Sequence, residues 1–371
     1  MSGGVDSSVA ALLLLEKGFD VIGLTMQLVP CGAEKNSGCC GLAAVNSAQK
    51  VCQKLNIPHY VLNFRQPFQK KVIDYFCREY QAGRTPNPCV VCNQFIKFDL
   101  LLRRAREIGA DYLATGHYAR LRREILNPKS EIQNIKLLKG KDKEKDQSYF
   151  LYRLTQNQLK YVLFPLGDLT KKQVRQIAKK ANLPAAERPE SQEICFIPDN
   201  DYRKFITQIY ADKTPHRNFR FDTGQARTNA EKTMKPGFIL DKNGKILGQH
   251  QGITFYTIGQ RKGLGIAGQK PVYVLKIDKN KNALIVGAEK GLYQKELLVK
   301  NLNWIRNKTP KLPLKAMAKI RYRQLMSAVS VYSESKNKMR VRFTKPQRAI
   351  TPGQSIVFYK GNEVLSGGII V

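Results

Sequence analysis

In the first half of the chain, short apolar runs alternate with segments in which apolar residues recur at helical spacing. Apolar runs at residues 20–28, 59–64 and 111–115 are typical of buried strands. Between them, residues 45–55 and 72–80 place apolar side chains on one face of a helix. Strands that alternate with helices predict a parallel sheet, and ligands then bind beyond the carboxyl ends of its strands.

Further helices are indicated by signals at their ends. Residues 8–17 form an apolar segment followed by a glycine, which predicts a helix with a glycine stop. Asp99 is expected to cap a helix that ends at Gly109. The string Thr-Lys-Lys-Gln at residues 170–173 is a capping box, and it predicts a helix that continues to about Asn182.

Short strands replace this alternation in the last third of the chain. The expected strands cover residues 272–277, 283–286, 297–304, 316–323, 329–332, 339–343, 355–359 and 368–371. Residues 338–343 alternate basic and apolar side chains, which gives a strand one basic face and one apolar face. This pattern is typical of a β-barrel or a sandwich.

The pattern therefore divides the chain into three domains. We predict an α/β fold with a doubly wound, Rossmann-like parallel sheet over residues 1–204, a small α+β domain over residues 205–287 and a C-terminal β-barrel over residues 288–371. Residues 122–134 are expected to be an insertion beside a charged loop at residues 139–145.

The charge balance is strongly basic. The 371 residues carry a formal net charge of +34, from 63 Lys and Arg against 29 Asp and Glu. This excess indicates a polyanionic partner such as nucleic acid, although an AT-rich genome can also produce a lysine-rich protein. A membrane surface would also attract the charge, but the longest apolar stretch, residues 9–15, is too short to span a bilayer. No secretory leader is expected.

Eight cysteines are too few for a disulfide scaffold in a chain of this length, so we expect thiols in a cytoplasmic protein. Cys52 and Cys77 lie on apolar helix faces and are expected in the core. Cys31, Cys39 and Cys40 lie in a glycine-containing loop. That loop is either a metal site or an accessible thiol-bearing segment.

Two other thiols form a C-x-x-C pair. Cys89 and Cys92 lie in a proline-rich loop just before a helix. Their spacing suits zinc or redox chemistry, but a four-ligand zinc site needs a second pair, and none is nearby. Cys195 stands alone beyond the helix expected after residue 170, and by itself it would indicate only a structural position.

The first seven residues carry the strongest chemical signal. Gly3 and Gly4 let successive N–H groups converge on one point. Ser2 and Ser7 add hydroxyl donors, and Asp6 adds a carboxylate of the kind that holds Mg²⁺. A glycine-rich turn that opens a helix binds phosphate, because its N–H groups and the helix dipole favour an anion. An ordinary turn before a buried helix is the alternative.

The string Ser-Gly-Gly-Val-Asp-Ser lacks the lysine of the GxxxxGK[ST] loop and resembles the PP-loop of ATP pyrophosphatases, which adenylate a substrate. Further motifs follow it in order, at residues 87–93, 114–118, 146–150, 191–196, 252–265, 320–324 and 351–355. With these motifs the chain closely resembles the tRNA-specific 2-thiouridylase (MnmA) family over essentially its whole length.

The resemblance implies ATP-dependent 2-thiolation of the wobble uridine, U34, of tRNA, with AMP and pyrophosphate as products. The C2 oxygen of uracil is a poor leaving group, and adenylation makes it part of AMP, a good one. The implied ATP-binding residues are Ser2, Gly3, Gly4, Val5, Asp6, Ser7, Met26 and Gly116. Mg²⁺ is expected near Asp6.

By the same resemblance, Cys195 carries the sulfur as a persulfide and Cys92 is the catalytic nucleophile. Either the terminal sulfur attacks C2 and a transient Cys92–Cys195 disulfide forms on resolution, or Cys92 first releases sulfide, which then attacks. Both routes need thiolate character. Arg84 and Arg188 are candidates for lowering the thiol pKa values.

The implied contacts to the target base are Asn87, Pro88 and Cys89. Some family members have Asp where this chain has Cys89, so carboxylate chemistry is not available at that position. Cys89, Cys92 and Cys195 would together offer three thiolates to an iron–sulfur cluster, which is an alternative route. The implied tRNA contacts are His117, Asp146, Gln147, Ser148, Arg321, Tyr322 and Gln354.

The substrates implied by the family are the tRNAs for Lys, Glu and Gln, and the implied sulfur donor is a cysteine desulfurase or a sulfur-relay protein. Two other hypotheses compete. One is a PP-loop enzyme that uses ammonia or an amino acid, against which the thiol pair and the basic barrel argue. The other is an RNA-binding protein without catalysis.

PP-loop domains place an apolar strand directly before the loop, whereas this sequence begins at the loop itself. We hypothesise that translation of the natural chain starts upstream of Met1 and that roughly six to ten residues, about one strand, are absent. Without that strand the sheet would lose backbone pairing and the loop would lose its anchor.

Overall fold

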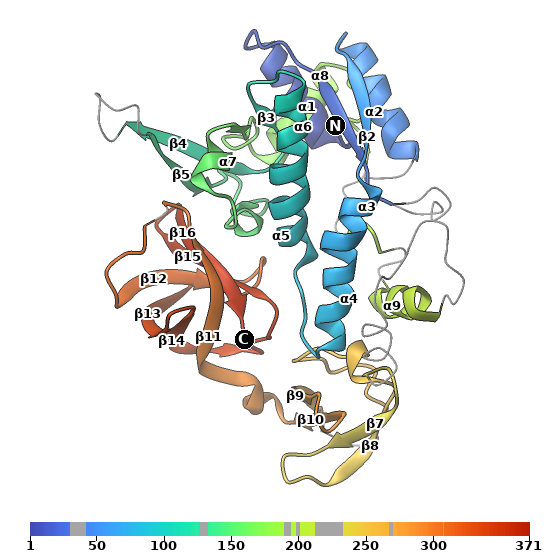
Figure 1. Cartoon of the computed structure of the whole chain (residues 1–371), viewed down its shortest axis with the longest axis vertical. Helices are drawn as coiled ribbons and strands as arrows, with labels where there is room; N and C mark the ends of the chain where they lie inside the picture. The colour runs from blue at the N-terminus through green and yellow to red at the C-terminus, as the bar shows by residue number, and fades with distance from the viewer. Residues whose placement is uncertain are drawn as a thin grey trace.

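The structure is a computed structural model that describes residues 1–29, 42–125, 133–188, 194–197, 201–211, 233–266, 270–306 and 308–371. Figure 1 shows the N-terminal α/β part at the top, two helical columns that run down from it, the C-terminal barrel to one side and a small sheet at the bottom. In the part of the chain that is described, no helix is both long enough and apolar enough to cross a membrane.

The predicted parallel sheet is present as two separate pairs of strands. β1 (Gly23–Gln27) pairs with β2 (His59–Asn63), and β3 (Leu113–Ala114) pairs with β6 (Val162–Leu163). Both pairs are parallel, and each is joined by a long crossover connection, as parallel pairing requires. The helices around them are α1 (Val5–Leu15), α2 (Leu42–Lys54) and α8 (Lys171–Lys180).

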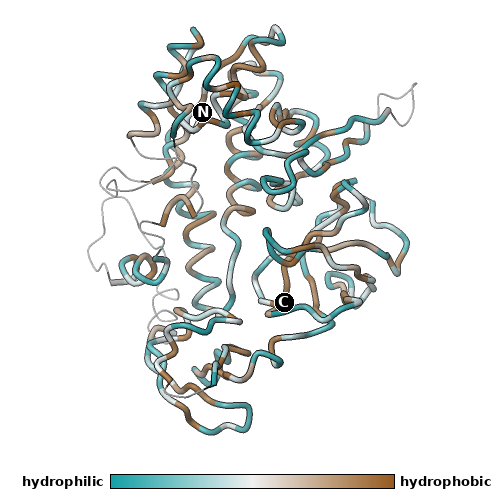
Figure 2. The backbone as a smooth tube through the Cα atoms, turned by 180° about the vertical axis from the view of Figure 1, so that it is seen from behind, coloured by the Kyte–Doolittle hydropathy of each residue, from teal (hydrophilic) through white to brown (hydrophobic). Residues whose placement is uncertain are grey.

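Two helical columns join the sheet to the rest of the molecule (Figure 1). The first consists of α3 (Arg65–Phe68), the π-helical segment η1 (Gln69–Ile73) and α4 (Asp74–Gln81). The second consists of α5 (Pro88–Cys92), the π-helical segment η2 (Asn93–Leu101) and α6 (Leu102–Glu107). Figure 2 shows hydrophobic and hydrophilic positions alternating along both columns, as expected for helices with one buried face.

The prediction that Asp99 caps the second column was wrong. The column begins at Asn87, whose Oδ1 accepts a hydrogen bond from the Val90 N–H at 3.3 Å. Pro88 follows at the first helical position, where its missing N–H costs nothing. Asp99 lies inside the helix and instead accepts a hydrogen bond from Arg103, one turn later, at 3.0 Å. The proline at the start of the column was therefore the stronger signal.

The capping box at Thr170 is confirmed. The Thr170 hydroxyl accepts from the Gln173 N–H at 3.3 Å, and the Gln173 side chain accepts from the Thr170 N–H at 2.8 Å. Helix α8 ends at Lys180, and Asn182 follows with a left-handed φ of +49°. The helix thus stops slightly earlier than predicted.

The middle of the chain forms helix α9 (Tyr202–Ala211) and a small mixed sheet. Its strands lie in the order β8 (Ile246–His250), β7 (Gly237–Leu240), β10 (Ala283–Gly287) and β9 (Tyr273–Asp278). Short 3₁₀ turns, Ser148–Phe150, Ile253–Phe255 and Glu289–Leu292, and helix α7 (Gln156–Leu159) connect the larger elements.

The last part of the chain is a closed barrel. Its strands are β11 (Tyr293–Trp304), β14 (Lys338–Arg348), β13 (Ser327–Ser335), β12 (Leu314–Lys319), β15 (Ser355–Lys360) and β16 (Glu363–Ile370), in spatial order. Pairing of β11 with β16 closes it. Closure leaves the barrel without exposed sheet edges at this seam, since the first and last strands bond to each other.

A hairpin from the N-terminal part extends the barrel sheet. The hairpin is formed by β4 (Ala119–Ile125) and β5 (Gln133–Lys139), which contain the two ends of the expected insertion at residues 122–134; residues 126–132 of that insertion lie outside the described residues. β5 joins β16 through the pair Leu138–Glu363. Buried aromatic side chains of the barrel and of the N-terminal part share one hydrophobic cluster, which includes Tyr149 and Tyr359. The two parts therefore pack as one unit.

Candidate nucleotide and thiol site

The turn that opens α1 requires glycine. Gly3 has a φ of +69°, and a Cβ there would lie 2.5 Å from the carbonyl oxygen of Ala44. The Gly3 carbonyl accepts hydrogen bonds from the Ser47 hydroxyl at 2.9 Å and from the Arg188 guanidinium at 3.0 Å. These contacts from two distant segments fix the position of the turn.

Hydroxyl groups of the turn itself form further hydrogen bonds within it. The Ser2 and Ser7 hydroxyls lie 3.1 Å apart, and the Ser7 hydroxyl donates to the Gly4 carbonyl at 3.0 Å. Gly4 is the N-cap of α1, so the first N–H groups of an 11-residue helix point toward the turn. This arrangement suits the binding of a phosphate group.

The carboxylate of Asp6 has two partners that the sequence did not reveal. The Lys171 ammonium lies 2.7 Å from Oδ1 and 2.8 Å from Oδ2, and the Tyr118 hydroxyl donates to Oδ1 at 2.7 Å. Lys171 is buried at the start of α8. The capping box placed Lys171 at a helix start, but nothing in the sequence paired it with Asp6. A magnesium ion at Asp6 requires Lys171 to move away from the carboxylate.

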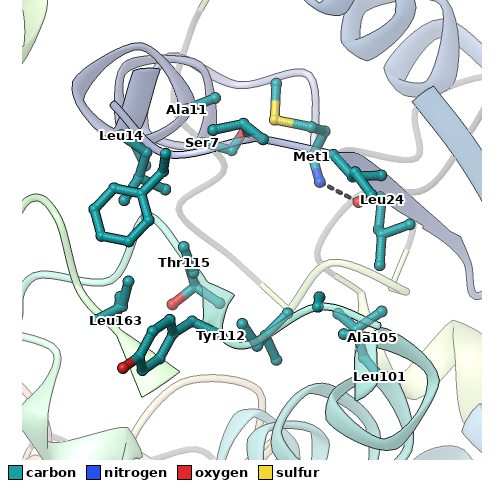
Figure 3. A pocket seen from close by; sticks show the side chains of 18 of the residues that line it. Met1, Ser7, Ala11, Leu14, Leu24, Leu101, Ala105, Tyr112, Thr115 and Leu163 are labelled. Atoms are coloured by element: carbon teal, nitrogen blue, oxygen red, sulfur yellow. Dashed lines mark hydrogen bonds between the residues drawn. The ribbon is translucent and has the colours of Figure 1, made fainter. Parts of the chain in front are cut away.

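A cavity of about 740 Å³ lies between β1 and β3 and reaches the glycine-rich turn. Figure 3 shows Met1, Ser7 and Ala11 on one side of it and Tyr112 and Thr115 on the other. Five of the predicted nucleotide-binding residues line this cavity: Ser2, Asp6, Ser7, Met26 and Gly116.

Close contacts hold Gly116 and Met1, which both line this cavity. A Cβ at Gly116 would lie 2.8 Å from the backbone carbon of Asp6, so the close approach of this strand end to the turn requires glycine. The Met1 ammonium donates to the Leu24 carbonyl, and burial lowers the pKa of this amine to about 6. The Thr25 hydroxyl donates to the Met1 carbonyl at 2.8 Å. The first residue therefore lies against β1.

The two predicted catalytic thiols border the same hydrophobic cluster. Cys92 is buried within it on α5, and the half-buried Cys195 packs against it. Cys89, one turn before Cys92, is exposed. Cys52 and Cys77 are buried, as predicted. Cys31, Cys39 and Cys40 lie outside the described residues, as do residues 191–193 of the motif that precedes Cys195.

The two arginines proposed to activate the thiols are engaged elsewhere. Arg84 makes a bidentate ion pair with Glu79, at 2.5 and 2.7 Å, and Arg188 binds the Gly3 carbonyl. These contacts do not support the prediction that either guanidinium lowers the pKa of a catalytic thiol. Arg188 instead links the glycine-rich turn to the chain segment that leads to Cys195.

The thiols Cys89, Cys92 and Cys195 are not placed together as a metal site. Across the described ranges, which include these three, no group of three or more His, Cys, Asp or Glu side chains is placed to hold a metal ion. The three-thiolate cluster considered as an alternative route is therefore not seen among these residues. A physical reason is that Cys92 faces the core while Cys89 faces solvent.

Several residues predicted to contact tRNA have structural partners. His117 is buried between Phe98 and Phe164, and its Nδ1 lies 2.8 Å from the Thr115 hydroxyl. Burial holds the pKa of His117 well below its ordinary value, and nearby Lys97 adds to this effect. The Gln147 side chain accepts from the Tyr118 N–H at 3.0 Å.

The remaining residues of this group also bind within the protein. Buried Asp146 accepts from the N–H and the hydroxyl of Ser148, each at 3.1 Å. The half-buried Arg321 donates to the Ala349 carbonyl at 2.8 Å, and the Tyr322 ring lies 4.6 Å from the Phe150 ring. The Gln354 amide donates to the loop before α5, as described below.

The basic face predicted at residues 338–343 is largely neutralised. Arg340 pairs with Glu334 at 2.7 Å and with Glu296 at 3.3 Å, while Arg342 pairs with Glu296 at 2.7 Å. These exposed pairs form a ladder across β11, β14 and β13. Such pairs add little stability, and they reduce the positive charge that this face offers to a polyanion.

Three known families match successive parts of the chain. The family described as tRNA methyl transferase HUP domain matches residues 1–199, the tRNA methyl transferase PRC-barrel domain matches residues 229–288, and the aminomethyltransferase beta-barrel domain matches residues 294–370. This succession agrees with the predicted fold class: an α/β domain, a smaller middle domain and a β-barrel.

Curated relatives match the whole chain. Proteins named tRNA-specific 2-thiouridylase MnmA from Carboxydothermus hydrogenoformans and Acetivibrio thermocellus are both 48% identical over 374 residues. The matches cover 100% of this chain and 96% and 97% of those proteins. A protein of the same name from Heliobacterium modesticaldum is 48% identical over 375 residues, with 91% of its length covered.

Solved structures resemble the chain only distantly. A predicted subunit of tRNA methyltransferase from Methanocaldococcus jannaschii has a TM-score of 0.28 at 16% identity, covering 48% of this chain and 72% of that one. NMN synthetase from Francisella tularensis has a TM-score of 0.30 at 15% identity, covering 58% and 77%. Neither likeness is close enough to support a fold or a function.

Proposed function

The chain belongs to the tRNA-specific 2-thiouridylase family, and from this premise we propose that it replaces the C2 oxygen of the wobble uridine, U34, with sulfur at the expense of ATP. The observation that carries the proposal is the 48% identity to members of this family along the full length of the chain. The glycine-rich turn, the cavity beside it and the two thiols of one hydrophobic cluster support the proposal.

The first step is adenylation. The C2 oxygen attacks the α-phosphorus of ATP, a C2–O–AMP bond forms and pyrophosphate leaves. The turn at Gly3 and the N-terminus of α1 would bind the leaving pyrophosphate, with Met26 and Gly116 beside the nucleotide. Mg²⁺ bound with ATP would offset the charge that develops on pyrophosphate, and Asp6 is the residue expected to hold it.

The second step transfers sulfur. The terminal sulfur of a Cys195 persulfide attacks C2, and AMP leaves with the original oxygen. The Cys92 thiolate then attacks the Cys195 sulfur, so a Cys92–Cys195 disulfide forms and the C2 thiocarbonyl is released. If Cys92 attacks the persulfide first, the same disulfide forms and hydrosulfide attacks C2. Either way, a thiol reductant must then return both cysteines to thiols.

The proposed partners follow from the reaction. The base must leave the anticodon stack to meet Asn87, Pro88 and Cys89 at the start of α5. The tRNAs for Lys, Glu and Gln are the proposed substrates, and a cysteine desulfurase or sulfur-relay protein is the proposed source of the persulfide. The net charge of +34 favours salt-sensitive binding of the tRNA backbone.

Transfer of radiolabelled sulfur to tRNA tests the proposal. With ATP, Mg²⁺ and a cysteine desulfurase, the unaltered chain should label tRNA, and Cys92→Ser and Cys195→Ser should each abolish labelling. Cys77→Ala, which removes a buried thiol to which no catalytic role is assigned, should keep it. Binding of tRNA with no labelling by the unaltered chain would instead favour an RNA-binding protein without catalysis.

A further inference from the structure

The loop before the thiol-bearing helix α5 lies where three parts of the molecule meet. Residues 82–87 connect α4 to α5, and Thr85 lies within this loop. The barrel contacts Thr85, and the middle part of the chain contacts both Thr85 and Gly83. The loop is therefore held by elements that follow it by more than 170 residues in the sequence.

The barrel holds the backbone of the loop. The Gln354 amide donates to the Thr85 carbonyl at 3.0 Å and to the Pro86 carbonyl at 3.2 Å, while the Thr85 N–H donates to the Pro352 carbonyl at 2.9 Å. Between them, Gly353 has a φ of +90°, and a Cβ there would lie 2.9 Å from the Thr85 carbonyl oxygen. The barrel turn and the loop are thus in direct backbone contact.

The middle part of the chain also contacts this loop. The Thr85 hydroxyl donates to the Thr257 hydroxyl at 3.2 Å. Gly83 has a φ of +70°, and a Cβ there would lie 2.9 Å from the Ile277 side chain on β9. The loop cannot shift toward the middle sheet without displacing these contacts.

The position of the loop determines where α5 begins. Asn87 follows the clamped residues directly and caps α5, which carries Cys89 at its first turn and Cys92 at its end. Pro86 and Pro88 cannot donate backbone hydrogen bonds, so the carbonyls of this loop depend on donors from elsewhere. The Gln354 amide nitrogen donates to two consecutive carbonyls of this loop, those of Thr85 and Pro86.

We propose that Gln354 is a positioning residue for the reaction: its amide holds the Thr85 and Pro86 carbonyls and so sets where the start of α5 and Cys92 lie. The inference rests on the proposed function for the reaction that this loop serves. It differs from a direct tRNA contact by Gln354, because the amide acts within the protein, on the loop before α5.

Gln354→Ala tests this role against its matched control, Gln324→Ala. The Gln324 amide lies in the same barrel and donates at 2.8 Å to Gln347, within the barrel. With a tRNA-Lys transcript, Gln354→Ala should lower kcat about tenfold or more and leave the Kd for tRNA within about twofold. Gln354→Lys, which retains a donor, should recover part of kcat. A raised Kd with unchanged kcat would overturn the proposal.

A second measurement does not depend on turnover. The exposed Cys89 should react with a maleimide at a different rate in Gln354→Ala and in Gly353→Ala, which pushes the barrel from the loop, than in the unaltered chain, read by mass analysis of its peptide. Gln324→Ala should react at the unaltered rate. Equal rates in all variants would refute the positioning role. Failure of the unaltered chain to transfer sulfur would count against the proposed function alone.

Discussion

The Lys171 ammonium spans both oxygens of the Asp6 carboxylate, at 2.7 and 2.8 Å, although the two residues are 165 positions apart. The Tyr118 hydroxyl binds the same carboxylate. Because this carboxylate lies in the glycine-rich turn, a cation already stands where a polyphosphate is expected. The pair therefore connects α8 to the nucleotide site.

Lys171→Met should weaken pyrophosphate binding about tenfold or more. The change removes a buried positive charge beside the turn and leaves Asp6 to repel the anion. Calorimetric titration with pyrophosphate in the absence of Mg²⁺ measures this without any catalysis, since Mg²⁺ could otherwise take the place of the ammonium at Asp6. The control is Lys172→Met, which makes the same change of charge at the exposed neighbour. Equal affinities of the two variants would exclude a role for Lys171 in anion binding.

Gly116→Ala should also lower nucleotide affinity, through sterics rather than charge. Its Cβ would lie 2.8 Å from the Asp6 backbone, so the strand end and the turn must separate. A lower midpoint of thermal unfolding should accompany weaker ATP binding. Gly248→Ala provides the control, because a Cβ there would meet only the Ile266 side chain, at 3.9 Å. If both variants bind ATP with the affinity of the unaltered chain, the close approach of Gly116 to Asp6 is not needed for nucleotide binding.

The free energy of unfolding should fall as the pH decreases below about 6.5, the ordinary pKa of histidine. Burial lowers the pKa of His117 in the folded state, so the unfolded chain binds more protons in this range. The stabilisation is complete above the unfolded pKa and is lost as the pH falls. His59 and His250 have pKa values shifted in the same direction by burial.

Chemical denaturation at pH 7.5 and pH 5.5 measures this loss. His117→Gln should lose less stability between the two pH values than the unaltered chain, since one titrating group has been removed. The pH dependence of the free energy of unfolding that remains in this variant comes in part from His59 and His250. An equal loss of stability between the two pH values in both proteins would show that His117 does not titrate as its burial implies.

Local signals in the sequence predicted local structure well. The capping box at Thr170 needs only contacts across three residues, and the structure contains both of its hydrogen bonds. The single signal at Asp99 failed, because Asn87 and Pro88 begin a longer helix in which Asp99 is an interior residue. The capping preference of one residue is worth too little to interrupt a helix whose face is buried.

Contacts between distant segments were not predictable in the same way. The two described ends of the expected insertion belong to strands β4 and β5, and β5 joins the barrel through the pair Leu138–Glu363. No periodicity in these strands identifies that partner. The pairing of Lys171 with Asp6 likewise depends on how α8 packs on α1. The glycine-rich turn could be recognised because the spacing of its residues along the chain is itself the signal. The distant residues that contact this turn could not be recognised, because no local pattern marks them.

The two cysteines of α5 should differ sharply in reactivity toward iodoacetamide. Cys89 is exposed, whereas Cys92, one turn later, is 8% exposed within the hydrophobic cluster. Brief labelling of the folded chain followed by mass analysis should therefore modify Cys89 well before Cys92, and labelling in guanidinium chloride should remove the difference. Cys77, fully buried and with a pKa raised by burial, is the internal reference for a protected thiol. Faster modification of Cys92 than of Cys89 in the folded chain would mean that α5 presents the opposite face to solvent, contrary to the burial of Cys92 in this structure.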